Sequence, residues 1–379
     1  MIFKNAKIIF PDRIEQGDVL VDGGRIANIG KIDTPGQEVI DLAGNYLAPG
    51  FIDLHIHGAM SRDTMEGTLE AFEAICNYHA AGGTTSLLLT TTTASTEEII
   101  RVLNAVKQTK DARILGVHVE GPYISREKPG AQTPRYIRNP DPAETERILA
   151  HADVIKRMTL APELPGALEL IDALQARGIC ASGGHSDAWD EDARAAFARG
   201  MRQVTHTFNC MSSARRRGMY RVAGLLEFAM SEPGVLCELI ADDRHVSATL
   251  MRMLYRAKGA DGICLVTDAT AGAGLPEGEK FRLAEVDCVV RDAVGVTADG
   301  KALAGSTANM IRLVRNMVNI VGAPLHEAVR MATLNPARAI GIEARNGVIA
   351  EGADADLVAL STGLDVVQTY AGGRPVFSR

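Results

Sequence analysis

The chain has 379 residues, a formal net charge of −7 and 46% hydrophobic residues. This length and composition indicate a folded protein with a large core, either one α/β barrel with an appendage or two domains. The acidic balance argues against nucleic acid as a partner, and no apolar run is long enough to predict a membrane span. Six scattered cysteines without a CxxC pair, and an N-terminus unlike a signal peptide, predict a cytoplasmic protein.

Short strands separated by turns are predicted at both ends of the chain. In the first 48 residues they are expected at 6–10, 18–21, 25–29 and 38–41, with Gly23-Gly24 as a hairpin turn. After Asn346 they are expected at 347–349, 356–360, 366–370 and 374–377. We therefore predict one small β domain that combines residues 1–48 with residues 347–379.

Residues 49–346 show a different pattern, in which apolar strand-like runs alternate with amphipathic helical stretches. Helices are predicted at 69–81, 143–151, 166–176 and 190–199. Strands are predicted at 84–90, 113–120, 158–161, 178–182, 203–206, 234–240 and 262–267. Repeated βα spacing over about 300 residues favours a (β/α)8 TIM-like barrel over an open sheet.

Two histidines end the first strand of this region, Phe51-Ile52-Asp53-Leu54-His55-Ile56-His57. Side chains alternate along a strand, so His55 and His57 project to the same side, about 6.5–7 Å apart. Two imidazoles in this arrangement can share a divalent metal or border a two-metal site. The alternative is a pair of hydrogen-bonded polar groups at a strand end.

Four more polar residues follow the ends of later predicted strands: Glu120, His185, His206 and Asp268. Each has a structural alternative, such as a helix cap for Glu120 or Asp268 and a packed histidine for the other two. Their joint occurrence where a barrel builds its active site favours a metal centre instead. Imidazole and carboxylate suit Zn²⁺ or Fe²⁺, which lowers the pKa of a bound water and supplies hydroxide at neutral pH. Asp268 would then carry protons.

An ordered set of motifs resembles the amidohydrolase superfamily, and within it the branch that deacetylates N-acetylglucosamine 6-phosphate. The motifs are FIDLHIHG, HVEGPY, GGHS, THTFN, IADDRHV, LVTDAT, AGS and ATLNPARAIG. The resemblance implies a (β/α)8 barrel flanked by a small β-sandwich built from both termini, and a homodimer. It also implies a small-molecule amino sugar substrate.

The resemblance also implies residue roles. Glu120, His185 and His206 match the principal metal ligands, and His55 with His57 matches a second-metal position, so one or two divalent ions are expected. Asp268 matches the catalytic acid/base and can be a further ligand. The residues that match substrate contacts are Asn209, Cys210, Arg217 and His245. The implied reaction is hydrolysis of the N-acetyl group of an N-acetylhexosamine 6-phosphate by metal-bound hydroxide.

Three loops depart from the pattern of this branch. Gln132 stands where a histidine is common, Asp243-Arg244 replaces a glycine and its neighbour, and Gly218-Met219-Tyr220 replaces Glu-Pro-Gly. Gln132 can still donate a hydrogen bond to the substrate, and Arg244 or Arg216 can contact a phosphate in a different geometry. The alternatives are therefore another N-acyl amino sugar, a cyclic amide or an N-acyl amino acid as substrate. A non-catalytic binding protein is more remote, because all the expected ligands are present.

Overall fold

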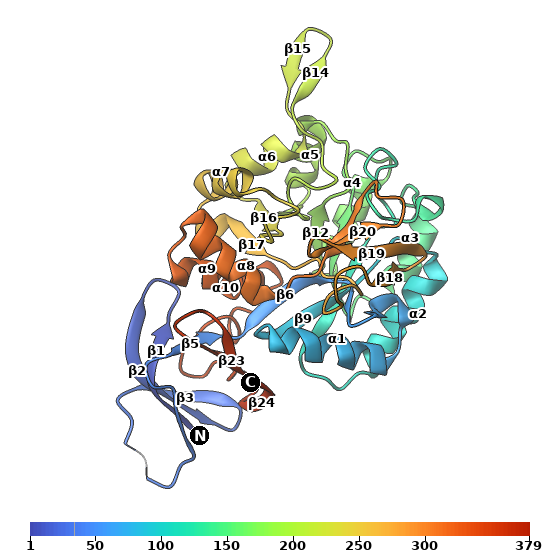
Figure 1. Cartoon of the computed structure of the whole chain (residues 1–379). Helices are drawn as coiled ribbons and strands as arrows, with labels where there is room; N and C mark the ends of the chain where they lie inside the picture. The colour runs from blue at the N-terminus through green and yellow to red at the C-terminus, as the bar shows by residue number, and fades with distance from the viewer. Residues whose placement is uncertain (34) are drawn as a thin grey trace.

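Eight parallel strands form the centre of the computed structural model, which describes residues 1–33 and 35–379 (Figure 1). In chain order they are β6 (Phe51–Ile56), β9 (Thr84–Thr91), β10 (Ile114–Glu120), β11 (Ile155–Leu160), β12 (Cys180–Gly183), β13 (Gln203–Val204), β16 (Leu236–Leu239) and β17 (Ile263–Leu265). Neighbours in the chain are neighbours in the sheet, and a bridge between Ile56 and Ala269 brings the first and last strands together. The predicted barrel is confirmed.

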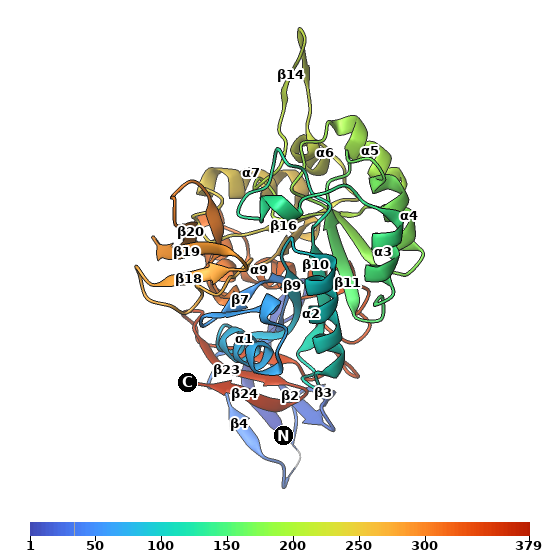
Figure 2. The same cartoon turned by 90° about the vertical axis from the view of Figure 1, so that its right-hand side faces the viewer.

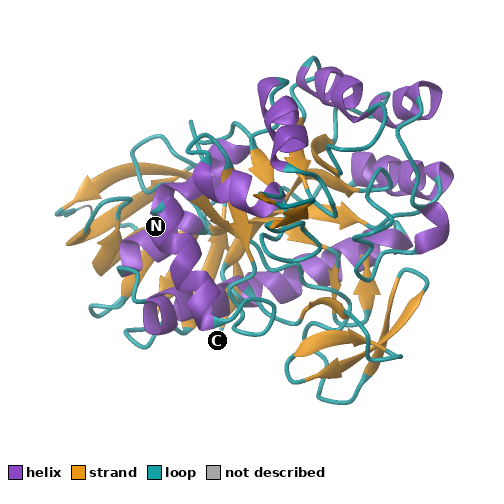
Figure 3. Ribbon diagram, turned by 90° about the horizontal axis from the view of Figure 1, so that it is seen from above, coloured by secondary structure: helices purple, strands orange, loops and turns teal. Residues whose placement is uncertain are grey.

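Helices surround the barrel strands, as the view from above shows (Figure 3). They are α1 (Leu69–Ala81), α2 (Thr96–Gln108), α3 (Pro142–Leu149), α4 (Ala167–Gln175), α5 (Asp190–Ala198), α6 (Leu225–Ser231), α7 (Ala248–Lys258), α8 (Met310–Asn316), α9 (Leu325–Met331) and α10 (Leu334–Ala339), with the short turns η1 (Thr64–Glu66), η2 (Pro134–Tyr136), η3 (Ala260–Gly262) and η4 (Met317–Val321). Local signals set their ends: Thr68 caps α1, and Ser95 with Glu98 forms a capping box on α2. Helix 69–81 is therefore confirmed at both ends.

Both ends of the chain meet in one mixed eight-stranded sheet below the barrel (Figures 1 and 2). Its strands are β1 (Ile2–Ile9), β2 (Ile14–Asp22), β3 (Arg25–Gly30), β4 (Val39–Asp41), β5 (Tyr46–Pro49), β22 (Leu357–Leu360), β23 (Val366–Ala371) and β24 (Arg374–Ser378). Antiparallel pairing of β5 with β22 joins the two ends, and the sheet has its own apolar core around Phe3 and Tyr370. The domain boundaries at 48/49 and 346/347 stay a prediction.

The strand predicted at 347–349 is wrong. Gly347 has a φ of +84°, and a Cβ there would lie 2.8 Å from the carbonyl oxygen of Thr333. This residue turns the chain from the barrel towards the small sheet, and only glycine adopts that conformation without strain at such close approach. Ile349 still packs in the core of the sheet.

Three β insertions interrupt the barrel pattern. A four-stranded antiparallel sheet follows β17 and lies beside the barrel in Figure 2: β18 (Lys280–Leu283), β19 (Val286–Arg291), β20 (Val294–Thr297) and β21 (Leu303–Ser306). A hairpin of β14 (Arg215–Arg217) and β15 (Tyr220–Val222) projects from the body of the molecule. A short pair, β7 (Gly58–Ala59) and β8 (Arg62–Asp63), follows the histidine strand. Arg215, Arg216 and Arg217 therefore lie on one strand of this hairpin.

Among the residues that the structure describes, no helix is long and apolar enough to cross a membrane.

Candidate active site

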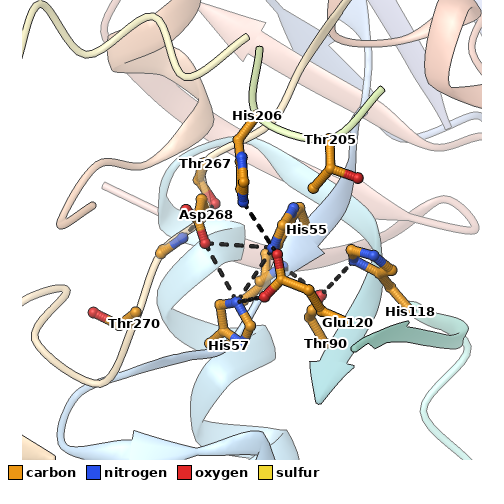
Figure 4. A network of polar contacts seen from close by, with 12 residues as sticks. His55, His57, Thr90, His118, Glu120, Thr205, His206, Thr267, Asp268 and Thr270 are labelled. Carbon is orange, nitrogen blue, oxygen red and sulfur yellow. Dashed lines mark hydrogen bonds and ion pairs between the residues drawn. The ribbon is translucent and has the colours of Figure 1, made fainter. Parts of the chain in front are cut away.

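Five strand ends bring the predicted ligands to one edge of the barrel, and Figure 4 shows five of these residues: His55, His57, Glu120, His206 and Asp268. His55 is on β6 and His57 follows it, Glu120 is the last residue of β10, and His185 and His206 come two residues after β12 and β13. Asp268 follows β17 and bonds back to the first strand, since its backbone N–H donates to the His55 carbonyl at 2.9 Å. Parallel strands point their carboxyl ends the same way, and residues far apart in sequence therefore converge here.

Glu120 lies between two groups of histidines. Its Oε1 is 3.3 Å from His185 Nε2 and 3.2 Å from His206 Nε2, and those two nitrogens are 3.1 Å apart. Towards the other group, Oε1 is 3.4 Å from His55 Nε2 and Oε2 is 3.2 Å from His57 Nε2, with 3.2 Å between the nitrogens. The side chains of all six predicted residues are buried. The structure therefore forms two three-residue clusters that share one carboxylate.

Three of the four histidines are held through the ring nitrogen that faces away from Glu120. His185 Nδ1 lies 2.9 Å from the Lys128 carbonyl and His206 Nδ1 lies 3.1 Å from the Asn209 carbonyl. His55 Nδ1 lies 3.3 Å from the carboxylate of Glu238. None of these acceptors carries a hydrogen, so each Nδ1 is the donor and each Nε2 keeps its lone pair free for a metal.

Backbone conformation at the site is also unusual. His185, His206 and Asp268 have φ values of +47°, +30° and +48°, in the left-handed region that side chains with a Cβ seldom occupy. Each such residue costs about 1–3 kcal/mol and persists where the surrounding structure holds it. For Asp268 the hold is a pair of backbone hydrogen bonds, to the His55 carbonyl at 2.9 Å and from Ser306 at 2.8 Å. The fold thus accepts a local cost to aim these side chains.

Electrostatics keep both acids of the site ionised. Burial would raise the pKa of Glu120, but the neighbouring imidazoles of His55, His185 and His206 hold it well below its usual range. Burial acts the same way on Asp268, but the charge of His55 and the hydrogen bond and charge of His57 lower its pKa to about 2. In His57, burial is outweighed by hydrogen bonds to Asp268 and Glu120, which raise its pKa to about 9. Two buried carboxylates therefore require nearby positive charge.

The donor set fits a divalent metal. Zinc with ligands at about 2.0–2.1 Å in tetrahedral geometry separates those ligands by about 3.3 Å, which is close to the spacing in both clusters. Glu120 Oε1 is buried and has no hydrogen-bond partner among the described residues. An acceptor left without a donor at the centre of converging imidazoles indicates a position for a cation. The site therefore supports a divalent metal.

A cavity of about 270 Å³ borders both clusters and contains four of the predicted substrate residues: Gln132, Asn209, Cys210 and His245. His245 is fixed by Asp242, whose carboxylate lies 2.7 Å from its Nδ1. Leu283 of β18 and Leu303 of β21 add an apolar wall. The β18–β21 insertion, which the sequence reading missed, therefore forms part of the candidate substrate pocket.

The structure does not bring the two predicted arginines to this cavity. Arg217 lies on the projecting hairpin, where its guanidinium stacks 4.1 Å from the Trp189 ring and pairs with Glu191 at 2.9 Å. Arg244 points to the carbonyl of Asp292 at 3.0 Å. Neither lines the pocket of its own chain, and no Lys or Arg does among the described lining residues. The positions were inferred from motif spacing, which does not specify where a loop turns.

Sequence reasoning also missed a buried ion pair under the site. Glu238 of β16 pairs with Arg157 of β11, and both side chains are almost completely buried. A charged residue inside each of two apolar strands, Leu-Cys-Glu-Leu and Ile-Lys-Arg-Met-Thr-Leu, was the available signal.

Comparison of the chain with known proteins identifies one family whose model matches it. A model of the Amidohydrolase family matches residues 46–376. The N-acetylglucosamine-6-phosphate deacetylase of Lysinibacillus sphaericus is 35% identical over 99% of this chain and 97% of its own length. The human protein of the same name is 34% identical over 99% of this chain and 95% of its own.

Solved structures agree with the sequence relatives. N-acetylglucosamine-6-phosphate deacetylase from Pasteurella multocida superposes with a TM-score of 0.92 at 33% identity, covering 99% of this chain and 98% of that one. A mutant of the Mycobacterium smegmatis enzyme, in complex with N-acetyl-D-glucosamine-6-phosphate, has a TM-score of 0.93 at 31% identity and covers 100% and 99%.

Proposed function

The chain belongs to the amidohydrolase family, and on that premise we propose that it hydrolyses the N-acetyl group of N-acetylglucosamine 6-phosphate. The products are acetate and the amino sugar phosphate. The observation that carries this proposal is the shared carboxylate of Glu120, with two pairs of imidazoles and Asp268 around it at the edge of a substrate-sized pocket. The similarity to deacetylases extends over nearly the whole chain, which supports the same reaction here.

We further propose that two ions bind, most suitably Zn²⁺ or Fe²⁺. Glu120, His185 and His206 would hold one, and His55, His57 and Glu120 the other. Asp268 Oδ1, at 3.4 Å from His55 Nε2 and 3.3 Å from His57 Nε2, would be a further ligand in the second group. A metal held by these residues would supply polarisation of the amide carbonyl and activation of a water.

The residues of the chain supply proton transfer and orientation. Asp268 borders the pocket as an ionised carboxylate, so it can accept the proton of the attacking water. The same carboxyl then donates that proton to the amide nitrogen, which lets the C–N bond break with the amine as leaving group. His245, which is fixed by Asp242, and Gln132 line the pocket and can form hydrogen bonds with the substrate.

A second candidate substrate follows from the pocket lining. Because no arginine or lysine lines it among the described residues, an unphosphorylated N-acyl amino sugar fits the pocket of a single chain as well. Acetate release should be measured on N-acetylglucosamine 6-phosphate, its galactosamine and mannosamine counterparts, and the free sugars. We expect the highest kcat/KM for N-acetylglucosamine 6-phosphate. Higher kcat/KM for the free sugar supports the second candidate, and no acetate from any compound refutes both.

We also propose that the chain forms a homodimer through the β14–β15 hairpin. Met219 and Tyr220 at its tip are 85% and 72% exposed, which is unusual for large apolar side chains on a projecting element. A second copy of the chain would cover them. The cytoplasmic location stays a prediction.

A further inference from the structure

Glu238 connects the two ligand clusters from beneath. Its side chain is 1% exposed and lies in the barrel interior. One carboxylate oxygen, Oε2, lies 3.3 Å from His55 Nδ1 and accepts the backbone N–H of His206 at 3.0 Å. The other oxygen, Oε1, faces Arg157. Glu238 thus contacts one histidine of each cluster. It contacts the imidazole of His55 and the backbone N–H of His206.

The contact with His55 determines which of its nitrogens carries the hydrogen. A carboxylate can only accept, so Nδ1 donates and Nε2 presents its lone pair to Glu120 and His57, at 3.4 Å and 3.2 Å. His55 has no other polar partner on its Nδ1 side among the described residues. Ring orientation and tautomer at this position therefore both depend on Glu238.

The contact with His206 acts on the backbone. His206 has a φ of +30°, and its amide is aimed into the barrel at Oε2. This hydrogen bond offsets part of the cost of the left-handed conformation. The imidazole of His206 is held separately through the Asn209 carbonyl. Loss of Glu238 should therefore affect the cluster with His55 more than the cluster with His206.

Arg157 makes this arrangement possible. A lone carboxylate in the barrel interior would be strongly unfavourable, and the guanidinium of Arg157 compensates its charge. Arg157 is in turn held by the hydroxyls of Ser182 at 2.7 Å and Thr205 at 3.2 Å. Stability alone does not explain the pair, because apolar residues of similar volume are often as stable as a buried ion pair. The contacts of the second carboxylate oxygen, Oε2, with the two histidines explain why a charged residue is present at this position.

We propose that Glu238 is a positioning residue, which fixes the Nδ1–H tautomer of His55 and thereby sets metal binding at the cluster of His55, His57 and Glu120. The tautomer statement stands on the structure alone. The metal statement rests on the proposed two-ion site.

The test compares Glu238→Gln with Ser182→Ala. A glutamine has one oxygen, so when it faces Arg157 its NH2 group meets the Nδ1–H of His55 and the N–H of His206, and donor meets donor. Ser182→Ala removes a partner of Arg157 and touches neither histidine. Because Glu238→Gln leaves Arg157 unpaired and can destabilise the barrel, a double variant, Glu238→Leu with Arg157→Leu, removes both charges together.

Two measurements on the full-length, metal-stripped protein decide the matter. In ¹⁵N spectra of histidine-labelled protein, assigned with His55→Asn, we expect His55 as the Nδ1–H tautomer in the wild type and in Ser182→Ala. The tautomer of His55 should change in Glu238→Gln and in the double variant. In titrations with Zn²⁺ alone, we expect the affinity for one equivalent of Zn²⁺ to fall about 10–100-fold in those two variants. The affinity for the second equivalent should change less.

An unchanged tautomer in a folded variant overturns the proposal, and so does wild-type affinity for both equivalents. Equal loss of both equivalents overturns the specific role at His55. If the wild type binds one equivalent, the two-ion proposal fails while the tautomer result still tests Glu238. Neither measurement depends on which substrate is cleaved, so a failed acetate assay is distinguishable from a failed role for Glu238.

Discussion

Gln132 Nε2 lies 2.6 Å from Glu120 Oε2, so the residue that replaces a common histidine holds the carboxylate shared by both clusters. Its own oxygen accepts the backbone N–H of Thr93 at 2.7 Å. Both ends of the amide are thus occupied, and the Glu120 carboxylate cannot rotate without breaking a buried hydrogen bond. We predicted that Gln132 contacts the substrate, and the structure shows it hydrogen-bonded to the carboxylate of Glu120.

Replacement of Gln132 by leucine should therefore weaken metal binding. We expect the affinity of the metal-stripped protein for Zn²⁺ to fall about 10–100-fold, as for other residues that orient a ligand from behind. Competition with a chelator of known affinity measures it. Gln175→Leu, at an exposed position of α4, is the matched control and should change nothing. Wild-type affinity in Gln132→Leu would show that Glu120 is oriented without it.

Asp268→Asn should remove most turnover while the metal remains. An amide cannot take the proton of the attacking water, and such a group contributes about 10²–10⁴-fold to rate. The measurement is kcat for acetate release, with metal content by elemental analysis on the same sample. Asp243→Asn, a neighbouring acid outside the pocket, should keep wild-type turnover. Near-normal kcat in Asp268→Asn would mean that another group moves the proton.

Metal affinity should rise with pH because the metal must displace a proton from His57. In the metal-free protein, hydrogen bonds to Asp268 and Glu120 outweigh burial and raise the pKa of His57 to about 9. Below that pH the ring is protonated and must lose the proton to bind, so His57 should add about one to the slope of log affinity against pH between about pH 6 and 9, which is a tenfold increase per pH unit.

Chelator competition at several pH values gives this slope. His57→Asn has no ring proton to lose and should show a slope lower by about one, which makes it the control. A slope that is the same in both proteins would contradict the raised pKa.

Glutamate at the hairpin tip should separate the proposed dimer. Met219→Glu with Tyr220→Glu places two charges where a second chain would bury apolar surface, which is unfavourable without a partner charge. Sedimentation velocity of the wild type should give a dimer, and of the variant a monomer. Met253→Glu on α7 is the control, because it alters another exposed apolar side chain away from the hairpin. A monomeric wild type, or a dimeric variant, would show that the hairpin is not the interface.

Residue types and strand-end spacing were enough to predict which polar residues converge at one edge of the barrel. Glu120, His185 and His206 each follow an apolar run, and a parallel barrel brings the ends of such runs together wherever they lie in the chain. The two-residue spacing of His55 and His57 likewise specifies a common side of one strand. Side-chain alternation along a strand and the common direction of parallel strands each allow one arrangement only. For that reason the barrel and the convergence of these residues could be predicted.

Loops and cross-barrel pairs followed no local rule. Arg217 was expected at the pocket, but the hairpin turns outward at Gly218, with a φ of +63°, and Trp189 and Glu191 hold the side chain there. Glu238 meets His55 across 183 residues because β6 and β16 flank β17 where the barrel closes, and both direct a side chain into its interior. Such contacts arise from the closure and stagger of the whole sheet, whereas the sequence pattern specifies only which residues are neighbours along each strand.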